Sequence, residues 1–293
     1  MEERERHIAT PQNDSIRLQE YGVGIFSSIT TKSGLKKAIK KGLITVNNDV
    51  ATTANYIKEG DLIVLYENEN SIENAPLKVS LLVRYEDEHL AIISKPAGII
   101  VSGNKHRTVV NALPFNLKRS SEKDGLIHPQ PVHRLDFPTS GLLLIAKTNF
   151  TVVALSELFA TKKITKTYHA ISIGSMETKG SIDSTIEGKM ASTYYEVLKT
   201  IKSPNYDFLN LVRLLPETGR RHQLRLHLSR IGHPILGDAT YGINGKILTG
   251  NGLYLHASSL EFEHPVTKDI ISIHEDLPNK FLKIFGQNDT FSS

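Results

Sequence analysis

Short apolar segments recur beyond residue 78 of this 293-residue chain, and each is long enough for a strand but too short for a helix. Only two or three segments in the same region show helical spacing of apolar residues. Strands that follow one another without regular helical crossovers favour antiparallel or mixed pairing. We therefore predict an α+β domain with a mixed or antiparallel sheet, with strands at 79–83, 90–94, 142–146 and 210–214.

A polar and acidic stretch at 67–76 interrupts the apolar rhythm and marks a domain boundary. The chain has room for two domains, and the smaller one, built from a helix and a β-hairpin, comes first. We expect a flexible N-terminus at 1–19, the small domain at 20–67, a linker at 68–77, the larger domain at 78–285 and a flexible tail at 286–293.

The segment HRLDFPTSG, residues 133–141, places an arginine and a carboxylate two positions apart just before the apolar strand at 142–146. Residues two apart on an extended chain share a face, so Arg134 and Asp136 project together. Taken alone, an aspartate before a proline turn is more often a turn former or a cap. A charged pair at a strand end beside a turn is also well placed to meet a ligand.

A second segment, Lys166-Thr167-Tyr168, reads as the start of a strand. A helix predicted over 149–163, with Asn149 as its N-cap, leads into it. Lys166 and Tyr168 share a face of this strand, so an ammonium group and a phenol lie close together. The alternative is an ordinary half-buried tyrosine on an amphipathic strand.

A third segment, residues 218–234, has apolar residues at helical spacing, and a glycine and a proline end the pattern. We expect Arg221 and Arg225 to lie one turn apart on this helix. A solvated face would accommodate two neighbouring guanidinium groups, but an anionic partner explains them better because the two cations repel each other.

Composition limits the class of protein. The chain has no cysteine, which excludes disulfides, thiolate nucleophiles and cysteine-based zinc sites. Lys and Arg number 35 against 31 Asp and Glu, a net charge of +4 that permits a nucleic-acid partner without requiring one. His222 and His227 are five residues apart and do not share a helix face, so we expect no metal and no cofactor. No long apolar run or leader is visible, and we expect a cytoplasmic protein that does not enter a membrane.

The blocks HRLDFPTSG, KTYHAI and ETGRRHQLRLHLSRIGHPILGDATYG resemble, in that order, the three motif blocks of the RluA-type pseudouridine synthases. The resemblance covers 78–278 and includes a Lys-Pro-x-Gly element at 95–98, with a departure at Ser102-Gly103. It implies that Asp136 is the catalytic carboxylate, that Tyr168 lies beside the target base, and that Arg225 pairs with Asp136. The matching blocks further imply contacts to substrate or RNA from His133, Arg134, Lys166, Arg220, Arg221 and Gln223.

The implied reaction breaks the bond from ribose carbon-1′ to nitrogen-1 of uracil and rejoins the sugar to carbon-5. One ionised carboxylate suffices, and Arg225 would favour the charged form of Asp136. Whether Asp136 attacks carbon-1′ or removes a sugar proton stays open, and Tyr168 could take part when carbon-5 loses its proton. The uridine must leave its stack, and Arg134 would fill the gap. We expect a monomer that acts on structured RNA, with ribosomal RNA favoured over transfer RNA.

The small domain has a predicted helix over 34–41, capped by Ser33, with Lys32, Lys36 and Lys40 recurring every four residues. An Asn47-Asn48 turn then separates two strands. With Ala-Ile-x-x-Gly-x-Ile-x-Val-Asn at 38–47, this domain resembles the S-four-like RNA-binding module of a ribosomal protein. The alternative is a solvated lysine face.

Two other classes remain open. A non-catalytic RNA-binding or ribosome-assembly protein would keep the basic helix, but it has no use for Asp136, Tyr168 and Arg225 together. A nucleoside hydrolase would need a second carboxylate to activate water, and the three blocks contain no candidate in a matching position.

Overall fold

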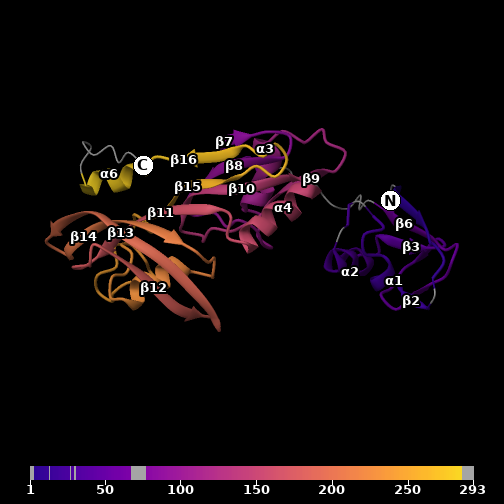
Figure 1. The fold of residues 1–293 in the computed structure, drawn as a ribbon, viewed down its shortest axis with the longest axis horizontal. Helices are drawn as coiled ribbons and strands as arrows, with labels where there is room; N and C mark the ends of the chain where they lie inside the picture. The colour runs from indigo at the N-terminus through magenta and orange to yellow at the C-terminus, as the bar shows by residue number, and fades with distance from the viewer. Residues whose placement is uncertain (1–2, 13, 27, 30, 67–76, 286–293) are drawn as a thin grey trace. The chain divides into compact units, whose positions relative to one another are not determined.

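The computed structural model describes residues 3–12, 14–26, 28–29, 31–66 and 77–285 (Figure 1). The chain divides into two compact units, 1–75 and 76–293, and the division falls within the linker expected at 68–77. Of that linker only Leu77 is described, and the tail expected at 286–293 lies outside the described residues. Each unit is treated by itself below.

The N-terminal unit is a small sheet with a helix packed on it (Figure 1). Its four-stranded sheet has the order β1-β6-β3-β4, and strands β2 and β5 form a separate pair. Helix α2 buries Leu35, Ala38 and Ile39 in the core. The elements are β1 (Glu3–Ile8), β2 (Ile16–Arg17), α1 (Leu18–Tyr21), α2 (Lys32–Lys40), β3 (Ile44–Val46), β4 (Asp49–Val50), β5 (Tyr56–Ile57) and β6 (Leu62–Tyr66).

Two expectations for this unit were wrong. Residues 1–19 were expected to be flexible, yet Glu3–Ile8 forms β1 and pairs antiparallel with β6. β1 is an edge strand with no fully buried side chain, so backbone pairing holds it in place without an apolar pattern in its sequence. Helix α2 starts at Lys32 rather than 34, because the Thr31 hydroxyl, not Ser33, accepts the Gly34 N–H at 3.1 Å.

The larger unit is a ten-stranded sheet of order β12-β13-β14-β11-β15-β10-β8-β7, with β9 paired to β10 and β16 to β15. All pairs are antiparallel except β10–β15, so the predicted mixed, largely antiparallel α+β fold is confirmed. Its elements are β7 (Leu82–Glu86), β8 (Leu90–Lys95), α3 (Val109–Asn116), β9 (Gly125–Pro131), β10 (Ser140–Thr148), α4 (Asn149–Ala160), β11 (Thr165–Ile173), β12 (Lys179–Ile186), β13 (Lys189–Ser203), β14 (Asp207–Pro216), α5 (Gln223–Arg230), β15 (Leu255–Glu263), β16 (Ile270–His274) and α6 (Asn279–Phe285).

Strand β10 is buried on both faces. Leu143 and Ile145 pack in a core with α3, whereas Leu142 and Leu144 pack in a second core with α4. A strand covered on both sides has no polar face, which explains the continuous apolar run in this segment. A third core lies beneath α5 and α6, where Leu224 and Phe281 contribute.

Strand β10 begins at the one parallel pairing of this sheet. Gly141 has φ +112°, and a Cβ atom there would lie 2.2 Å from the Ala257 carbonyl oxygen of β15. Only glycine combines this conformation with such a close approach. Gly141 therefore lets β10 meet β15 directly after the 132–139 loop, and it fixes where that loop joins the sheet.

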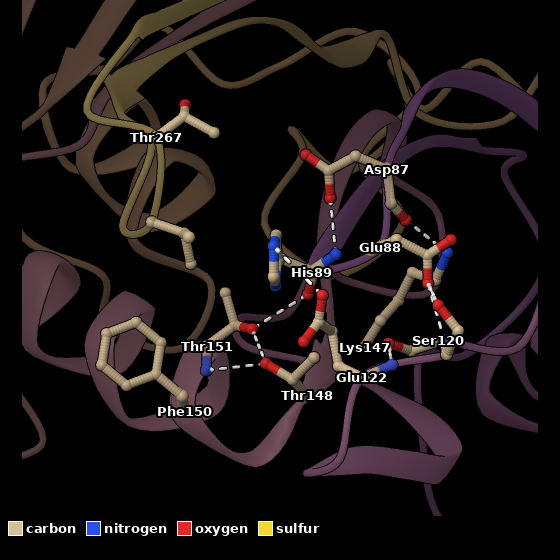
Figure 2. A network of polar contacts seen from close by, with 12 residues as sticks. Asp87, Glu88, His89, Ser120, Glu122, Lys147, Thr148, Phe150, Thr151 and Thr267 are labelled. Atoms are coloured by element: carbon tan, nitrogen blue, oxygen red, sulfur yellow. Dashed lines mark hydrogen bonds and ion pairs between the residues drawn. The ribbon is translucent and has the colours of Figure 1, made fainter.

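Polar contacts tie the start of α4 to the turn between β7 and β8 (Figure 2). The Asp87 carboxylate accepts the His89 N–H at 2.7 Å, and the Thr151 hydroxyl donates to the His89 carbonyl at 2.9 Å. Thr148 caps the helix by accepting the Thr151 N–H at 3.2 Å, in place of the expected Asn149. The helix ends at Ala160, short of the predicted residue 163. These contacts fix α4 against the sheet.

The predicted strand at 79–83 lies three residues later, at β7, and the predicted strand at 210–214 is longer, at β14. No helix in the part of the chain that the structure describes is long and apolar enough to span a membrane.

Candidate active site

A cavity of about 520 Å³ opens in the larger unit. This volume suits a small-molecule ligand or a single nucleotide. Its walls come from five separate stretches of sequence: the loop before β10, the end of α4, the start of β11, the loop and helix at 216–225, and Leu255 at the start of β15. The three segments that the sequence singled out therefore meet in one place.

Asp136 lies in the loop between β9 and β10, and its side chain is 15% exposed. The Thr139 N–H donates to the Asp136 carbonyl at 3.1 Å, and the next carbonyl, that of Phe137, accepts the Gly98 N–H at 2.9 Å. The backbone at Asp136 and directly after it is therefore fixed.

Beneath this loop lies Lys95, whose side chain is fully buried. Its ammonium donates to the carbonyls of Ile99 at 2.9 Å, Pro96 at 3.0 Å and Phe137 at 3.4 Å. Burial lowers the pKa of Lys95 to about 8, against the opposing effect of the Asp136 charge. Lys95 thus connects the end of β8 to the Asp136 loop, a role that the Lys-Pro-x-Gly pattern alone did not reveal.

Arg225 connects two carboxylates. Its Nη1 lies 3.5 Å from Asp136 Oδ2, so the structure brings together the pair expected from the sequence. Its shorter contacts are with Asp238: Nε to Oδ2 and Nη2 to Oδ1, both at 2.8 Å. The guanidinium carbon also lies 5.0 Å from the centre of the Tyr241 ring. Arg225 is therefore held by a two-pronged ion pair and directs its remaining nitrogen at Asp136.

Asp238 was missed by the sequence reasoning, because its place in GDATYG showed no spacing relation to Arg225. Its carboxylate is buried, and Oδ1 also accepts the N–H groups of Thr240 and Tyr241. Burial alone would raise the pKa of the Asp238 carboxyl, but these hydrogen bonds and Arg225 together hold that pKa below its ordinary value.

Tyr168 lines the cavity from β11. Burial and then the Asp136 charge raise the pKa of its phenol well above the ordinary value. At neutral pH the hydroxyl is therefore protonated, and it can donate a hydrogen bond but is a poor proton acceptor. Lys166, on the same face of β11, also lines the cavity.

His222 is a second group beside the carboxylate. Its Nε2 lies 3.8 Å from Asp136 Oδ1, and its Nδ1 lies 2.9 Å from the Tyr241 hydroxyl. Its backbone is left-handed, with φ 55°. Helix α5 therefore starts at Gln223, and the expectation that Arg221 and Arg225 share one helix was wrong, although both line the cavity.

Comparisons with known proteins agree with this geometry. Residues 89–230 match a family model described as RNA pseudouridylate synthase. An "Uncharacterized RNA pseudouridine synthase" from Aquifex aeolicus is 33% identical over 283 residues, which cover 87% of this chain and 89% of the relative. The chain belongs to the RNA pseudouridylate synthase family.

The synthase is accordingly an isomerase, as the motif blocks predicted. The "Ribosomal large subunit pseudouridine synthase D" of Vibrio vulnificus is 31% identical, over 92% of this chain and 89% of the relative. A solved structure, "Human RNA Pseudouridylate Synthase Domain Containing 4", has a TM-score of 0.55 at 25% identity and covers 73% of this chain and 94% of that chain.

Gln223 was expected to contact RNA, and the structure corrects this for the synthase. Its side chain is 4% exposed. The amide oxygen accepts from the Thr218 hydroxyl at 2.7 Å and the Arg220 N–H at 3.0 Å, while the amide nitrogen donates to Ser192 and Thr193, both at 2.9 Å. With these positions occupied inside the protein, Gln223 holds the 218–222 loop in place rather than binding substrate.

His133 also serves the scaffold. Its Nε2 accepts the Leu144 N–H at 2.9 Å, and burial lowers its pKa to about 3, so this nitrogen is not available to substrate. Arg134, Arg220 and Arg221 are exposed and line the cavity, as expected of RNA-facing residues. Among the described residues, no group of three or more His, Asp or Glu side chains could hold a metal ion.

The three lysines singled out in the N-terminal unit lie on α2. Lys36 and Lys40 are exposed, whereas Lys32 forms an ion pair with Glu20 at 2.5 Å. The charge of Lys32 is therefore partly compensated within the protein.

Replacing Asp238 should destabilise the larger unit. In Asp238→Asn the buried guanidinium of Arg225 loses its charged partner, and we expect a loss of about 3 kcal/mol of unfolding free energy at pH 7. Because the folded-state pKa of Asp238 is lowered, this contribution is present above the unfolded-state pKa of about 4 and is lost as pH falls through the folded-state value. Urea unfolding at pH 7 and pH 3 measures it. A difference between variant and wild type that does not shrink in acid would contradict the assignment.

Proposed function

We propose that this synthase isomerises a uridine in large-subunit ribosomal RNA and that Asp136 is its catalytic carboxylate. The observation that carries the proposal is an aspartate at the wall of a nucleotide-sized cavity with a fixed guanidinium 3.5 Å away. The name of the relative from Vibrio vulnificus supports ribosomal RNA as the substrate. Such a substrate would place the enzyme in the cytoplasm.

The proposed chemistry acts on an extruded nucleotide, because carbon-1′ and carbon-5 cannot be reached inside a stacked helix. Asp136, with the Arg225 guanidinium 3.5 Å away, acts on the ribose, either by attacking carbon-1′ or by removing a neighbouring sugar proton. Tyr168 lies beside the base and offers its ring for stacking. Exposed Arg134 fills the vacated position in the RNA, since a guanidinium stacks by its face and hydrogen bonds by its edge.

A hydrolase is the less favourable alternative. Among the described residues that line the cavity, the carboxylates are Asp136 and Glu217. The Glu217 side chain is 62% exposed and lies 3.4 Å from Lys162, so it is poorly placed to activate a buried water. An isomerase needs only the single buried carboxylate, because water must not intercept the sugar.

We further propose that the N-terminal unit binds RNA as an S-four-like module. The exposed ammonium groups of Lys36 and Lys40 on α2 support this, since Leu35 and Ile39 turn into the core and leave the lysines in solvent. Such a face would hold phosphates without reading sequence.

Asp136→Asn should abolish isomerisation but not RNA binding. The amide is nearly isosteric but carries no charge, so it can neither attack carbon-1′ nor accept a sugar proton. The assay is release of tritium from carbon-5 of uridine in a large-subunit rRNA transcript, beside a filter-binding measurement of the Kd. Wild type should release tritium and the variant none. Release by the variant at the wild-type rate would contradict the role, and no release from wild type would contradict the proposed function.

Lys36→Glu should raise the Kd for RNA. Loss of one phosphate contact should lower the slope of log Kd against log salt concentration by about 1. Lys58→Glu is the matched control, since Lys58 is exposed in the same unit but lies outside α2. Equal effects of the two substitutions would mean that only net charge matters and would dismiss α2 as the contact.

A further inference from the structure

His222 stands out among the cavity residues because its conformation is both strained and fixed. A left-handed backbone is unfavourable for a residue other than glycine, and such strain is retained at functional sites. The Tyr241 hydroxyl, 2.9 Å from Nδ1, sets the ring orientation. The opposite nitrogen, Nε2, faces Asp136 at 3.8 Å. The imidazole is therefore aimed at the place where the reacting nucleotide would lie.

We propose that His222 is the base that removes the proton from carbon-5 of the rearranged uracil. This inference rests on the proposed function and extends it to the step after the sugar has been rejoined. Nothing in the motif blocks assigned that step to this residue.

The step balances in atoms and electrons. Once carbon-1′ has bonded to carbon-5, carbon-5 carries both the sugar and its original hydrogen, and a double bond joins carbon-6 to nitrogen-1. His222 Nε2 takes the hydrogen as a proton. The electron pair of the broken bond forms the double bond between carbon-5 and carbon-6, and the displaced pair goes to nitrogen-1, which takes a proton from solvent. The product is pseudouridine.

Other groups in the cavity are less suited to this proton transfer. The Tyr168 phenol has a raised pKa, so at neutral pH it keeps its proton and cannot accept another from carbon-5. His133 has its Nε2 occupied by a backbone N–H. The arginines are cations, and Glu217 is exposed at the rim. Burial lowers the pKa of Lys166, but its ammonium lies over the Phe159 ring, 5.8 Å from the ring centre. Asp136 is engaged with the ribose. Among the described lining residues, His222 is left as the neutral base.

The environment of His222 favours the neutral ring before it takes the carbon-5 proton, and a nearby carboxylate stabilises the imidazolium that forms. Burial lowers the pKa of His222 below its ordinary value, and Arg225 and Arg221 lower it further. Asp136 and, more weakly, Asp238 act in the opposite direction. The ring is therefore neutral at pH 7, and the carboxylate of Asp136 lies next to the imidazolium that forms.

The Tyr241 hydroxyl contacts the ring nitrogen of His222 that does not face Asp136. When Nε2 accepts a proton, Nδ1 carries a hydrogen and donates it to the Tyr241 hydroxyl oxygen. The His222 side chain is 21% exposed, so the captured proton can pass to water. Loss of a carbon-5 label to solvent is the expected consequence.

The test is a carbon-5 isotope effect in His222→Gln. Large-subunit rRNA transcripts are made with ordinary uridine or with uridine deuterated at carbon-5, and pseudouridine is measured by nucleoside chromatography under single-turnover conditions. Glutamine keeps a polar atom near Nε2 but cannot act as a base. We expect a rate loss of about 100-fold or more, with a larger deuterium isotope effect than wild type, because deprotonation becomes limiting. RNA affinity and thermal unfolding should be unchanged.

Three comparisons separate this role from a structural one. Tyr168→Phe should keep the wild-type isotope effect, and the exposed His274→Gln on β16 should behave as wild type in every respect. Should His222→Gln fail to fold, Tyr241→Phe removes only the orienting hydroxyl and should show a smaller rate loss with a raised isotope effect.

The inference is overturned if His222→Gln keeps the wild-type rate or loses rate with no gain in isotope effect. It is also overturned if Tyr168→Phe shows the gain instead. Failure of the proposed function is distinguishable from these results, because wild type itself would then form no pseudouridine.

Discussion

The buried ion pair between Arg225 and Asp238 is the interaction on which the site depends. A guanidinium has more than one edge that can bind a carboxylate. One edge of Arg225 binds Asp238 through two nitrogens, each 2.8 Å from a carboxylate oxygen. The remaining nitrogen is thereby fixed 3.5 Å from Asp136. Backbone N–H groups of Thr240 and Tyr241 also donate to the buried Asp238 carboxylate and help to stabilise it. The result is a carboxylate held beside a fixed guanidinium at the edge of a cavity.

The sheet keeps Asp136 within reach of that cluster. Its loop is held from below by the buried ammonium of Lys95 and joins the sheet at Gly141, where β10 meets β15 in the only parallel pairing among the described strands of the larger unit. The opposite wall depends on Gln223, whose amide binds the 218–222 loop to β13. Rigid anchors on both sides suit a reaction in which a free base must rotate without water entering.

The sequence predicted the parts that local pattern controls. The apolar run of β10, the presence of a helix at α2 and the three separate blocks around the cavity followed from spacing and from the family resemblance. Distant pairings could not be predicted in this way: Asp238 has no spacing relation to Arg225, and only the folded chain brings it there. The left-handed backbone of His222 could not be predicted from the sequence either. His222 was expected to lie within the helix, and Arg221 was therefore wrongly placed on the same helix as Arg225. Gln223 was expected to bind RNA because the sequence does not show whether a polar residue in a motif is buried. Strand β1 was missed because an edge strand needs no apolar pattern.

The most direct test of the central claim is the single-turnover rate of pseudouridine formation by Arg225→Ala, measured with its Kd for the same rRNA transcript. Removal of the guanidinium leaves Asp136 as a partly buried carboxylate without its cation. The account predicts a loss of about 100-fold or more in rate with little change in Kd, and no rescue by Arg225→Lys, whose single ammonium cannot hold Asp238 and reach Asp136 together. A wild-type rate in Arg225→Ala would contradict it.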